Sequence, residues 1–505
     1  MEDVDTQPLN AAMADRAAAP CTASPRAGGA VDAVGVIGGG WAGMAAALEL
    51  AQAGRTVHVF EAAPVLGGRA RRVARRHPQV AGELDNGQHL LLGAYRHTIA
   101  LMRRAGVDPD AALLRLPLQM AYADGWRLQA PRLPAPWHLV GMGLTARGLH
   151  WRERKALAGV LSQLRAGNDE GDIDEDGMAG QTVAAWLGQM PPTLQQRLWF
   201  PLCVAALNTP AEQADARVFR RVLRDSLLAA RSDSDMLVPR WDLSRLFPEA
   251  AAQAIVAAGG TVRTGAAVQA IAESPHGWLL RTGASEQQVS QLVIATAPRQ
   301  AARLLAQIRH RSHEGALQAA AATLHAFDHA PIVTLYLNVG ALRLPRPFLA
   351  LDASAAAPGQ FVFDRAALST DPDAPADAGR DNVWSVVISA ADDAAALPQG
   401  ELARRVRAQL ATQLAPLLPD AARLAEARGE FVIAERLATF RCVPGLARPG
   451  NDIGVPRLAL AGDYTDAPAD NRYGPYPATI EAATRSGSAA AALLQREHVR
   501  SAATA

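Results

Sequence analysis

A glycine-rich run gives the clearest chemical signal in the chain. Gly38-Gly39-Gly40-Trp41-Ala42-Gly43 matches the G-x-G-x-x-G pattern of dinucleotide-binding turns. Gly38 permits a tight turn, Gly40 lets a pyrophosphate approach the backbone, and Gly43 lets the next helix pack closely on the strand. Glu61, 18 residues after Gly43, can accept hydrogen bonds from ribose hydroxyls and disfavours a 2′-phosphate. The run therefore predicts a dinucleotide site that does not take NADP.

A strand–helix–strand unit must hold this turn in place. Residues 34–37 form a short apolar run that is typical of a buried parallel strand. An Ala- and Leu-rich segment over residues 42–53 predicts a helix, whose first N–H groups and dipole face the phosphate. Residues 56–60 predict the second strand. Later segments, 261–263, 291–296 and 458–461, predict a return to the same sheet.

The residues after Glu61 distinguish one dinucleotide from another. Here Gly67-Gly68-Arg69 resembles a turn of the flavin amine oxidase and phytoene desaturase superfamily, which runs along the FAD pyrophosphate. The resemblance implies FAD, with Arg69 neutralising phosphate charge, and a mixed fold in which a Rossmann-type α/β domain is interleaved with an α+β substrate-binding domain. It also implies that a helix following Pro477 points its N-terminus at the flavin ring. The implied cofactor-binding residues are Gly38, Gly40, Trp41, Ala42, Gly43, Glu61, Gly68, Arg69, Gln88, His89, Val268, Gly462, Asp463, Thr479 and Ile480.

Longer segments resemble one family within that superfamily, hydroxysqualene dehydroxylase. They are residues 84–95, which contain Asp85-Asn86-Gly87-Gln88-His89, then 201–210, 223–227, 462–465 and 476–479. The resemblance spans about residues 34–494. It implies reductive removal of an allylic hydroxyl from hydroxysqualene, giving squalene for hopanoid synthesis, with hydride from reduced flavin. The partners implied are an apolar isoprenoid and an unidentified electron donor.

The proton donor of that reaction stays open among four residues. Asp85 and His89 lie in the segment that should approach the flavin ring, and Tyr473 and Tyr476 lie beside the C-terminal motif. His89 titrates near neutral pH but is equally compatible with a structural role. Asp85 is also compatible with capping a turn.

Three other functions are compatible with the same fold. Many amine oxidases use an active-site lysine, but Lys155 is the sole lysine of this chain and lies in a charged helix face. A carotenoid-type desaturase would oxidise a similar polyene, and a non-catalytic FAD-binding lipid carrier would show no turnover. The segment 473–481 has no cysteine, so we expect non-covalent FAD.

Length and composition predict two interleaved domains. The chain has 505 residues, 49% of them hydrophobic, and a formal net charge of +1, which gives no field to attract nucleic acid. The expected organisation is a disordered extension (1–30), FAD-binding parts (31–115, 235–305, 435–495), substrate-domain parts (116–234, 306–434) and a flexible tail (496–505).

Location and metal content are predicted from what the sequence lacks. Three scattered cysteines, no signal peptide and no apolar run of about 18 residues favour a cytoplasmic protein. The apolar and basic stretch 131–155 suggests peripheral contact with the inner face of the cell membrane. Residues 172–177 begin like a calcium loop, but Val183 stands where glutamate is needed, so we expect no metal.

Overall fold

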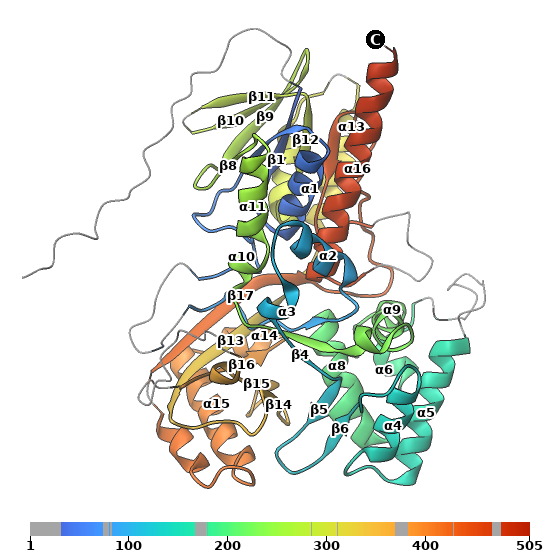
Figure 1. The fold of residues 1–505 in the computed structure, drawn as a ribbon, viewed down its shortest axis with the longest axis vertical. Helices are drawn as coiled ribbons and strands as arrows, with labels where there is room; N and C mark the ends of the chain where they lie inside the picture. The colour runs from blue at the N-terminus through green and yellow to red at the C-terminus, as the bar shows by residue number, and fades with distance from the viewer. Residues whose placement is uncertain are drawn as a thin grey trace, which may run out of the picture.

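A computed structural model describes residues 32–73, 80, 83–166, 178, 180–283, 285–310, 312–368, 382–427, 429–466 and 476–504 (Figure 1). Three expectations fall outside these residues. They are the N-terminal extension 1–30, the acidic loop 172–177, and the candidate proton donor Tyr473.

A five-stranded parallel sheet occupies the upper half of the molecule in Figure 1, in the order β18-β12-β1-β2-β8. Its strands are β1 (Ala33–Ile37), β2 (Thr56–Phe60), β8 (Thr261–Arg263), β12 (Gln291–Ile294) and β18 (Leu458–Leu460). Every residue of β1 is buried, as a parallel strand covered on both faces requires. The α/β prediction and the return of the chain to this sheet are confirmed.

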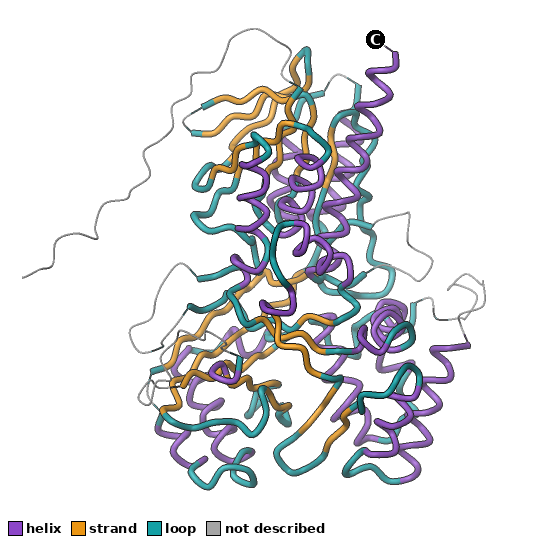
Figure 2. The backbone as a smooth tube through the Cα atoms, in the orientation of Figure 1, coloured by secondary structure: helices purple, strands orange, loops and turns teal. Residues whose placement is uncertain are grey.

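Layers of structure cover both faces of the sheet. On one face α1 (Trp41–Gln52) lies between α11 (Pro248–Ala257) and α16 (Ile480–Thr504) (Figures 1 and 2). On the other face, a Cβ added at Gly35 would lie 2.9 Å from Leu280 of β10. That layer is a three-stranded sheet of β9 (Val268–Ser274), β10 (Gly277–Thr282) and β11 (Glu286–Val289).

The last helix is longer than the sequence pattern predicts. The predicted flexible tail over residues 496–505 implies a helix that ends by residue 495, but α16 continues to Thr504. Its later turns have partners, since Gln291 Nε2 donates to Leu494 O at 2.8 Å and Arg457 N donates to Glu497 Oε2 at 3.1 Å. The first bond ties α16 to β12 near its expected end, and the second holds the helix beyond that end.

A second, antiparallel sheet lies below the first, in the order β14-β15-β16-β13-β17. Its strands are β13 (His329–Gly340), β14 (Phe348–Ala350), β15 (Phe361–Asp364), β16 (Asn382–Ile388) and β17 (Glu430–Phe440). One face packs on α15 (Gln399–Gln413). The domain boundary expected between residues 434 and 435 lies inside β17, which pairs with β13 as far as Phe440.

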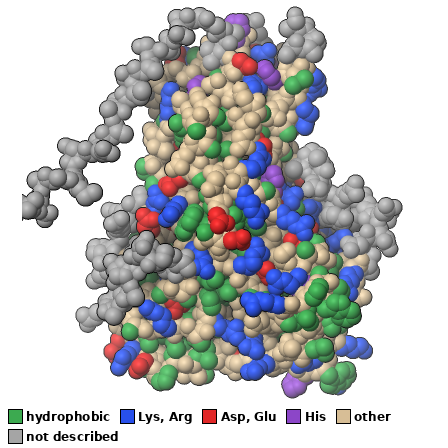
Figure 3. Space-filling model, viewed as in Figure 1, with side chains coloured by type: hydrophobic (Ala, Val, Ile, Leu, Met, Phe, Trp, Pro, Cys, Tyr) green, Lys and Arg blue, Asp and Glu red, His purple; other side chains and the backbone are tan. Residues whose placement is uncertain are grey.

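A helical lobe lies beside the second sheet. It comprises α4 (Trp137–Thr145), α5 (Trp151–Ala166), α6 (Val183–Trp186), α7 (Pro192–Leu194), a π-helical turn (Gln195–Trp199), α8 (Phe200–Leu207) and α9 (Ala216–Leu227). Trp199 is buried in its core, whereas Trp137 and Trp151 are exposed. Figure 3 shows hydrophobic side chains gathered over α4 and α5, at the lower right of the molecule.

Shorter elements connect these layers. They are α2 (Arg96–Arg104), α3 (Pro109–Ala112), α10 (Leu243–Leu246), α12 (Pro298–Gln307), α13 (Glu314–His325), α14 (Asp392–Ala396), β3 (Leu91–Leu92), β4 (Leu113–Leu116), β5 (Gln119–Ala121), β6 (Arg127–Gln129) and β7 (Met236–Pro239).

Candidate active site

The glycine turn between β1 and α1 has no room for side chains. Gly38 has φ +112°, and a Cβ there would lie 2.5 Å from Ala295 O. A Cβ at Gly43 would lie 1.9 Å from Gly38 O. Gly40, by contrast, meets nothing closer than 3.7 Å, which leaves its backbone approachable. The turn and packing roles predicted for Gly38 and Gly43 match this geometry, and the approach of a pyrophosphate to Gly40 stays a prediction.

The N-terminus of α1 fits a phosphate group. Trp41, Ala42 and Gly43 are buried, no side chain caps the terminus, and no acidic residue lies in the first turn. Buried N–H groups at a helix start need an acceptor, and an anion is the partner that also suits the dipole. Trp41 contributes its backbone only, because its indole N–H donates to Ala70 O at 2.9 Å.

Glu61 is held at the end of β2 by the backbone of the turn. Its Oε2 accepts from Gly39 N at 2.6 Å and its Oε1 from Ala63 N at 2.7 Å. Each oxygen keeps a second lone pair for a ribose hydroxyl. The Glu61 carbonyl accepts from Ala266 N at 2.8 Å, which brings the start of β9, at the buried Val268, beside the same turn.

The Gly-Gly-Arg turn lies against the first turn. Gly67 N donates to Gly39 O at 2.9 Å, and Gly68, with φ +64°, faces Gly40. Arg69 Nη2 donates to Asp463 Oδ1 at 2.6 Å, so two predicted cofactor residues that are far apart in sequence form an ion pair. Its Nη1 donates to Ala438 O at 2.7 Å. This pairing orients Arg69, whose contact with phosphate stays a prediction.

A half-buried arginine that sequence reasoning missed holds the C-terminal motif. Arg448 donates to four carbonyl oxygens of the segments 463–465 and 476, and no sequence pattern marks it. The distances are 3.1 Å to Tyr464 O, 2.6 Å to Tyr476 O, 2.8 Å to Asp463 O and 2.9 Å to Thr465 O. Gly462 is also required, because a Cβ there would lie 2.2 Å from the ring of Tyr464.

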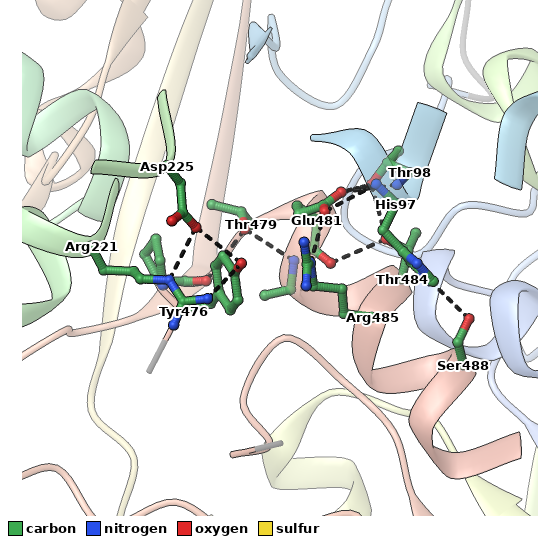
Figure 4. Close-up of polar contacts among 12 residues, drawn as sticks. His97, Thr98, Arg221, Asp225, Tyr476, Thr479, Glu481, Thr484, Arg485 and Ser488 are labelled. Atoms are coloured by element: carbon green, nitrogen blue, oxygen red, sulfur yellow. Dashed lines mark hydrogen bonds and ion pairs between the residues drawn. The ribbon is translucent and has the colours of Figure 1, made fainter. Parts of the chain in front are cut away.

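The start of α16 is fixed by two side chains (Figure 4). Thr479 Oγ1 accepts from Ala482 N at 3.2 Å, which makes Thr479 the cap of the helix that begins at Ile480. Glu481 is buried and accepts from Thr98 N at 2.9 Å and from Thr98 Oγ1 at 2.7 Å. These bonds fix the beginning of α16 against α2, at the helix terminus that is predicted to meet the flavin ring.

The segment Asp85–His89 joins the two sheets. The contacts are Tyr336 Oη to Asp85 O (2.9 Å), Ser385 Oγ to Gln88 Oε1 (3.2 Å), Asn86 Nδ2 to Glu435 Oε2 (2.9 Å) and Asn86 Nδ2 to Arg69 O (3.2 Å). The first three come from β13, β16 and β17, and the last reaches the Gly-Gly-Arg turn. The segment thus lies at the interface of two domains, where small-molecule sites are common.

Asp85 and His89 differ in how burial affects their protonation. Burial raises the pKa of Asp85 to about 7, although Leu243 N donates to its Oδ1 at 2.9 Å. Burial lowers the pKa of His89 below its ordinary value, opposed by the contact of its Nδ1 with Gly87 O at 2.8 Å. A neutral His89 ring suits a positioning role better than proton donation.

Tyr476 belongs to a polar cluster with α9 (Figure 4). Its hydroxyl donates to Asp225 Oδ2 at 3.0 Å and accepts from Arg221 Nη2 at 2.8 Å. Arg221 also donates to Asp225 at 3.0 Å and lies 4.2 Å from the Tyr476 ring centroid. Burial raises the pKa of Tyr476 to about 12, so the hydroxyl keeps its proton at neutral pH. The two partners were not predicted as site residues, although Asp225 lies in a segment that resembles the dehydroxylases.

Comparison with known proteins decides the family. The profile described as "Flavin containing amine oxidoreductase" matches residues 41–495. The chain belongs to this family. Membership of this family, together with the uncapped N-terminus of α1 that fits a phosphate group, identifies the protein as an FAD-dependent oxidoreductase.

Relatives within the flavin-containing oxidoreductases span nearly the whole chain. Hydroxysqualene dehydroxylase of Sinorhizobium fredii is 28% identical over 92% of this chain and 98% of its own length. The Rhodopseudomonas palustris enzyme of the same name is 29% identical over 91% and 98%. A shorter match, 33% identical over 15% of this chain, is to zeta-carotene desaturase of Zea mays.

Solved structures of other flavin enzymes share the fold. Cyclohexylamine oxidase from Brevibacterium oxydans covers 93% of this chain and 99% of its own, with TM-score 0.63 and 18% identity. Putrescine oxidase covers 92% and 99%, with TM-score 0.62 and 15% identity. At such identity the likeness concerns the fold alone.

The sole lysine of this flavin-containing oxidoreductase lies outside the candidate site. Lys155 is exposed on α5, in the helical lobe. None of the described helices combines the length and apolarity needed to cross a bilayer.

Proposed function

We propose that the protein reductively removes the allylic hydroxyl of hydroxysqualene and releases squalene and water. The observation that carries the proposal is the similarity to two hydroxysqualene dehydroxylases over more than nine tenths of both chains. The segments that resemble that family, including 85–89 and 223–227, lie at the junction of the two sheets and around Tyr476.

Non-covalent FAD would be held by the residues already described. Its pyrophosphate would lie at the α1 turn beside Gly40 and Gly68, and its ribose at Glu61. The pyrimidine edge of the ring would meet the α16 terminus at Thr479 and Ile480. Reduced FAD, once bound, supplies two electrons and a proton as hydride.

The chain's own task is to move a proton and to stabilise positive charge. We assign the proton donor to the Tyr476 hydroxyl, which would protonate the leaving hydroxyl so that it departs as water. Asp225, bonded to that hydroxyl, would return a proton to it from solvent, and Arg221 orients both. The C–O bond breaks, a C–H bond forms with the hydride, and the allylic system delocalises the intervening charge.

A single anaerobic experiment tests the proposal. The purified holoenzyme is reduced chemically, hydroxysqualene is added in detergent, and flavin absorbance is followed together with product analysis. We expect flavin re-oxidation with one squalene formed per flavin. Flavin that stays reduced, with no squalene, would refute the proposed substrate and leave the FAD assignment intact.

A carotenoid-type desaturase is the second candidate, because of the local match to zeta-carotene desaturase. Its reaction runs in the opposite redox direction. Oxidised holoenzyme and a carotenoid precursor should then give reduced flavin and a longer polyene, whereas our proposal predicts neither. The proposal also includes a separate electron donor that reduces the FAD, and a cytoplasmic location.

A further inference from the structure

Large exposed apolar side chains concentrate in one short stretch. Within the described residues they are Leu133, Trp137, Val140, Leu144, Trp151, Val256, Leu417, Leu437 and Val499. Five of these lie between Leu133 and Trp151, on α4, the loop before it and the start of α5. Single exposed apolar residues are ordinary on a soluble protein, but a cluster marks a contact surface.

Helix α4 is apolar on both faces. His138, Leu139 and Met142 face the interior. Trp137, Val140 and Leu144, at spacing i, i+3, i+7, lie on the outer face with exposed fractions of 62%, 44% and 74%. A surface helix normally carries polar residues there, so packing among the described residues gives no reason for the apolar outer face.

The exposed face is held rigidly. Arg154 of α5 donates to Leu144 O at 3.0 Å and to Ala146 O at 2.8 Å, which joins the end of α4 to the start of α5. A Cβ at Gly141 would lie 2.5 Å from Pro131, so the helix also packs closely on the preceding loop. The outward placement of Trp137 and Leu144 is therefore a property of the fold.

Within residues 131–165, the segment that contains this face, the exposed charges have one sign. Between residues 131 and 165 they are Arg132, Arg147, Arg152, Lys155 and Arg165. The single acid of this range, Glu153, is buried and accepts from His150 N at 2.7 Å. Exposed apolar side chains that share a segment with exposed basic ones suit the interface of an anionic lipid bilayer.

We propose that this face, here called the α4–α5 patch (Leu133, Trp137, Val140, Leu144, Trp151 and the five basic residues), docks on the surface of an anionic membrane. The patch lies on the helical lobe, over α4 and α5 (Figures 1 and 3). The inference rests on the proposed function in one respect: a squalene-like substrate dissolves in the bilayer. A second copy of this chain is the weaker occupant, because a symmetric contact would place the same basic side chains against each other.

Vesicle flotation of the FAD-loaded protein tests the patch. We expect it to float with vesicles of phosphatidylcholine and anionic phosphatidylglycerol, less with phosphatidylcholine alone, and less at high salt. Replacing the outer face by Trp137→Ser, Val140→Ser and Leu144→Ser together should lower the partition coefficient by about tenfold or more. Arg147→Glu, Arg152→Glu and Lys155→Glu together should lower it about as much on anionic vesicles.

Matched controls come from other surfaces. Val256→Ser, Leu417→Ser and Val499→Ser remove three exposed apolar side chains elsewhere, and Arg303→Glu, Arg343→Glu and Arg496→Glu make the same charge change elsewhere. Both controls should float like the parent protein. Flavin content and melting temperature, expected to be unchanged, show that each variant is folded.

Three outcomes would overturn the inference. They are no flotation of the parent protein, equal flotation of patch and control variants, or a dimer lost in the patch variants without vesicle binding. Flotation is measured without enzyme turnover. Flotation that depends on the patch therefore supports membrane docking even if hydroxysqualene is not reduced. Conversely, if the protein turns over hydroxysqualene in detergent but does not float with vesicles, the membrane-docking inference is refuted and the proposed function stands.

Discussion

The turn at α1 and the cluster around Tyr476 are built from different materials. The turn consists of backbone atoms that can pack closely because three residues lack side chains, with Gly38, Gly40 and Gly43 within six consecutive residues. The cluster is made of side-chain charges and hydroxyls from α9 and from the residues before α16. A site made of backbone, such as the α1 turn, can be recognised from one short motif. A site made of side chains, such as the Tyr476 cluster, forms only when distant segments fold together.

The largest expected effect is on the backbone-made turn. Gly43→Ala would place a Cβ 1.9 Å from Gly38 O and 3.1 Å from Ala295 Cβ, so helix and turn must separate. We expect a loss of more than about 3 kcal/mol in unfolding free energy and no bound flavin, measured by thermal melting and flavin absorbance.

Gly159→Ala in α5 is the control for that change, because a Cβ there meets nothing within 4 Å. It should stabilise the protein by about 0.5–1 kcal/mol. A Gly43→Ala protein with a normal flavin content would show that the close contact is dispensable.

Asp85 should give the next largest effect, through pH. Its folded pKa of about 7 lies above the ordinary 3.8, so the folded protein keeps a proton that the unfolded chain releases. Unfolding free energy should therefore fall as pH rises from about 4 to about 7, by roughly 4 kcal/mol in total. Asp85→Asn, which can still accept from Leu243 N, should remove that fall in denaturant titrations. Parallel pH profiles for the two proteins would contradict the raised pKa.

Tyr476→Phe tests the side-chain cluster directly. The ring keeps its contact with Arg221, but the proton donor is lost, so re-oxidation of reduced flavin by substrate should slow about 100-fold with flavin content unchanged. Asp225→Asn should slow it less, since it leaves the tyrosine proton in place. Stopped-flow absorbance measures both, and an unchanged Tyr476→Phe rate would move the proton donor elsewhere.

The Arg69–Asp463 pair combines features of both sites, because Arg69 belongs to a short sequence motif and Asp463 is far from it in the sequence. Arg69→Ala leaves the buried Asp463 without its partner, and we expect a loss of about 1–2 kcal/mol in stability together with weaker flavin retention. The double variant Arg69→Ala with Asp463→Asn should lose less than the sum of the single changes. Additive losses would mean that the two residues act independently.

This contrast explains which features could be predicted from the sequence and which could not. The strands around Val36 and Val59 and the α1 turn follow from local patterns, and each was predicted. The cap at Thr479 was not predicted, since Thr479 was expected only as a cofactor-binding residue. Arg448 and Arg221 were missed as site residues, because an arginine that binds distant carbonyls or a distant tyrosine has no local signature in the sequence. The domain boundary placed inside β17 has the same origin, since strand pairing is decided by a partner about 100 residues away.

The crossing of α16 over α1 has a consequence for biosynthesis. A Cβ at Gly487 would lie 2.1 Å from Ala42 O, so a helix from the end of the chain completes the surroundings of a turn made at its beginning. Asp463, Thr479 and Gly487 leave the ribosome long after the α1 turn, and β18 joins the sheet equally late. The surroundings of the α1 turn are therefore incomplete until these residues have been made, and capture of the cofactor belongs after that point, as the step that closes an interleaved fold.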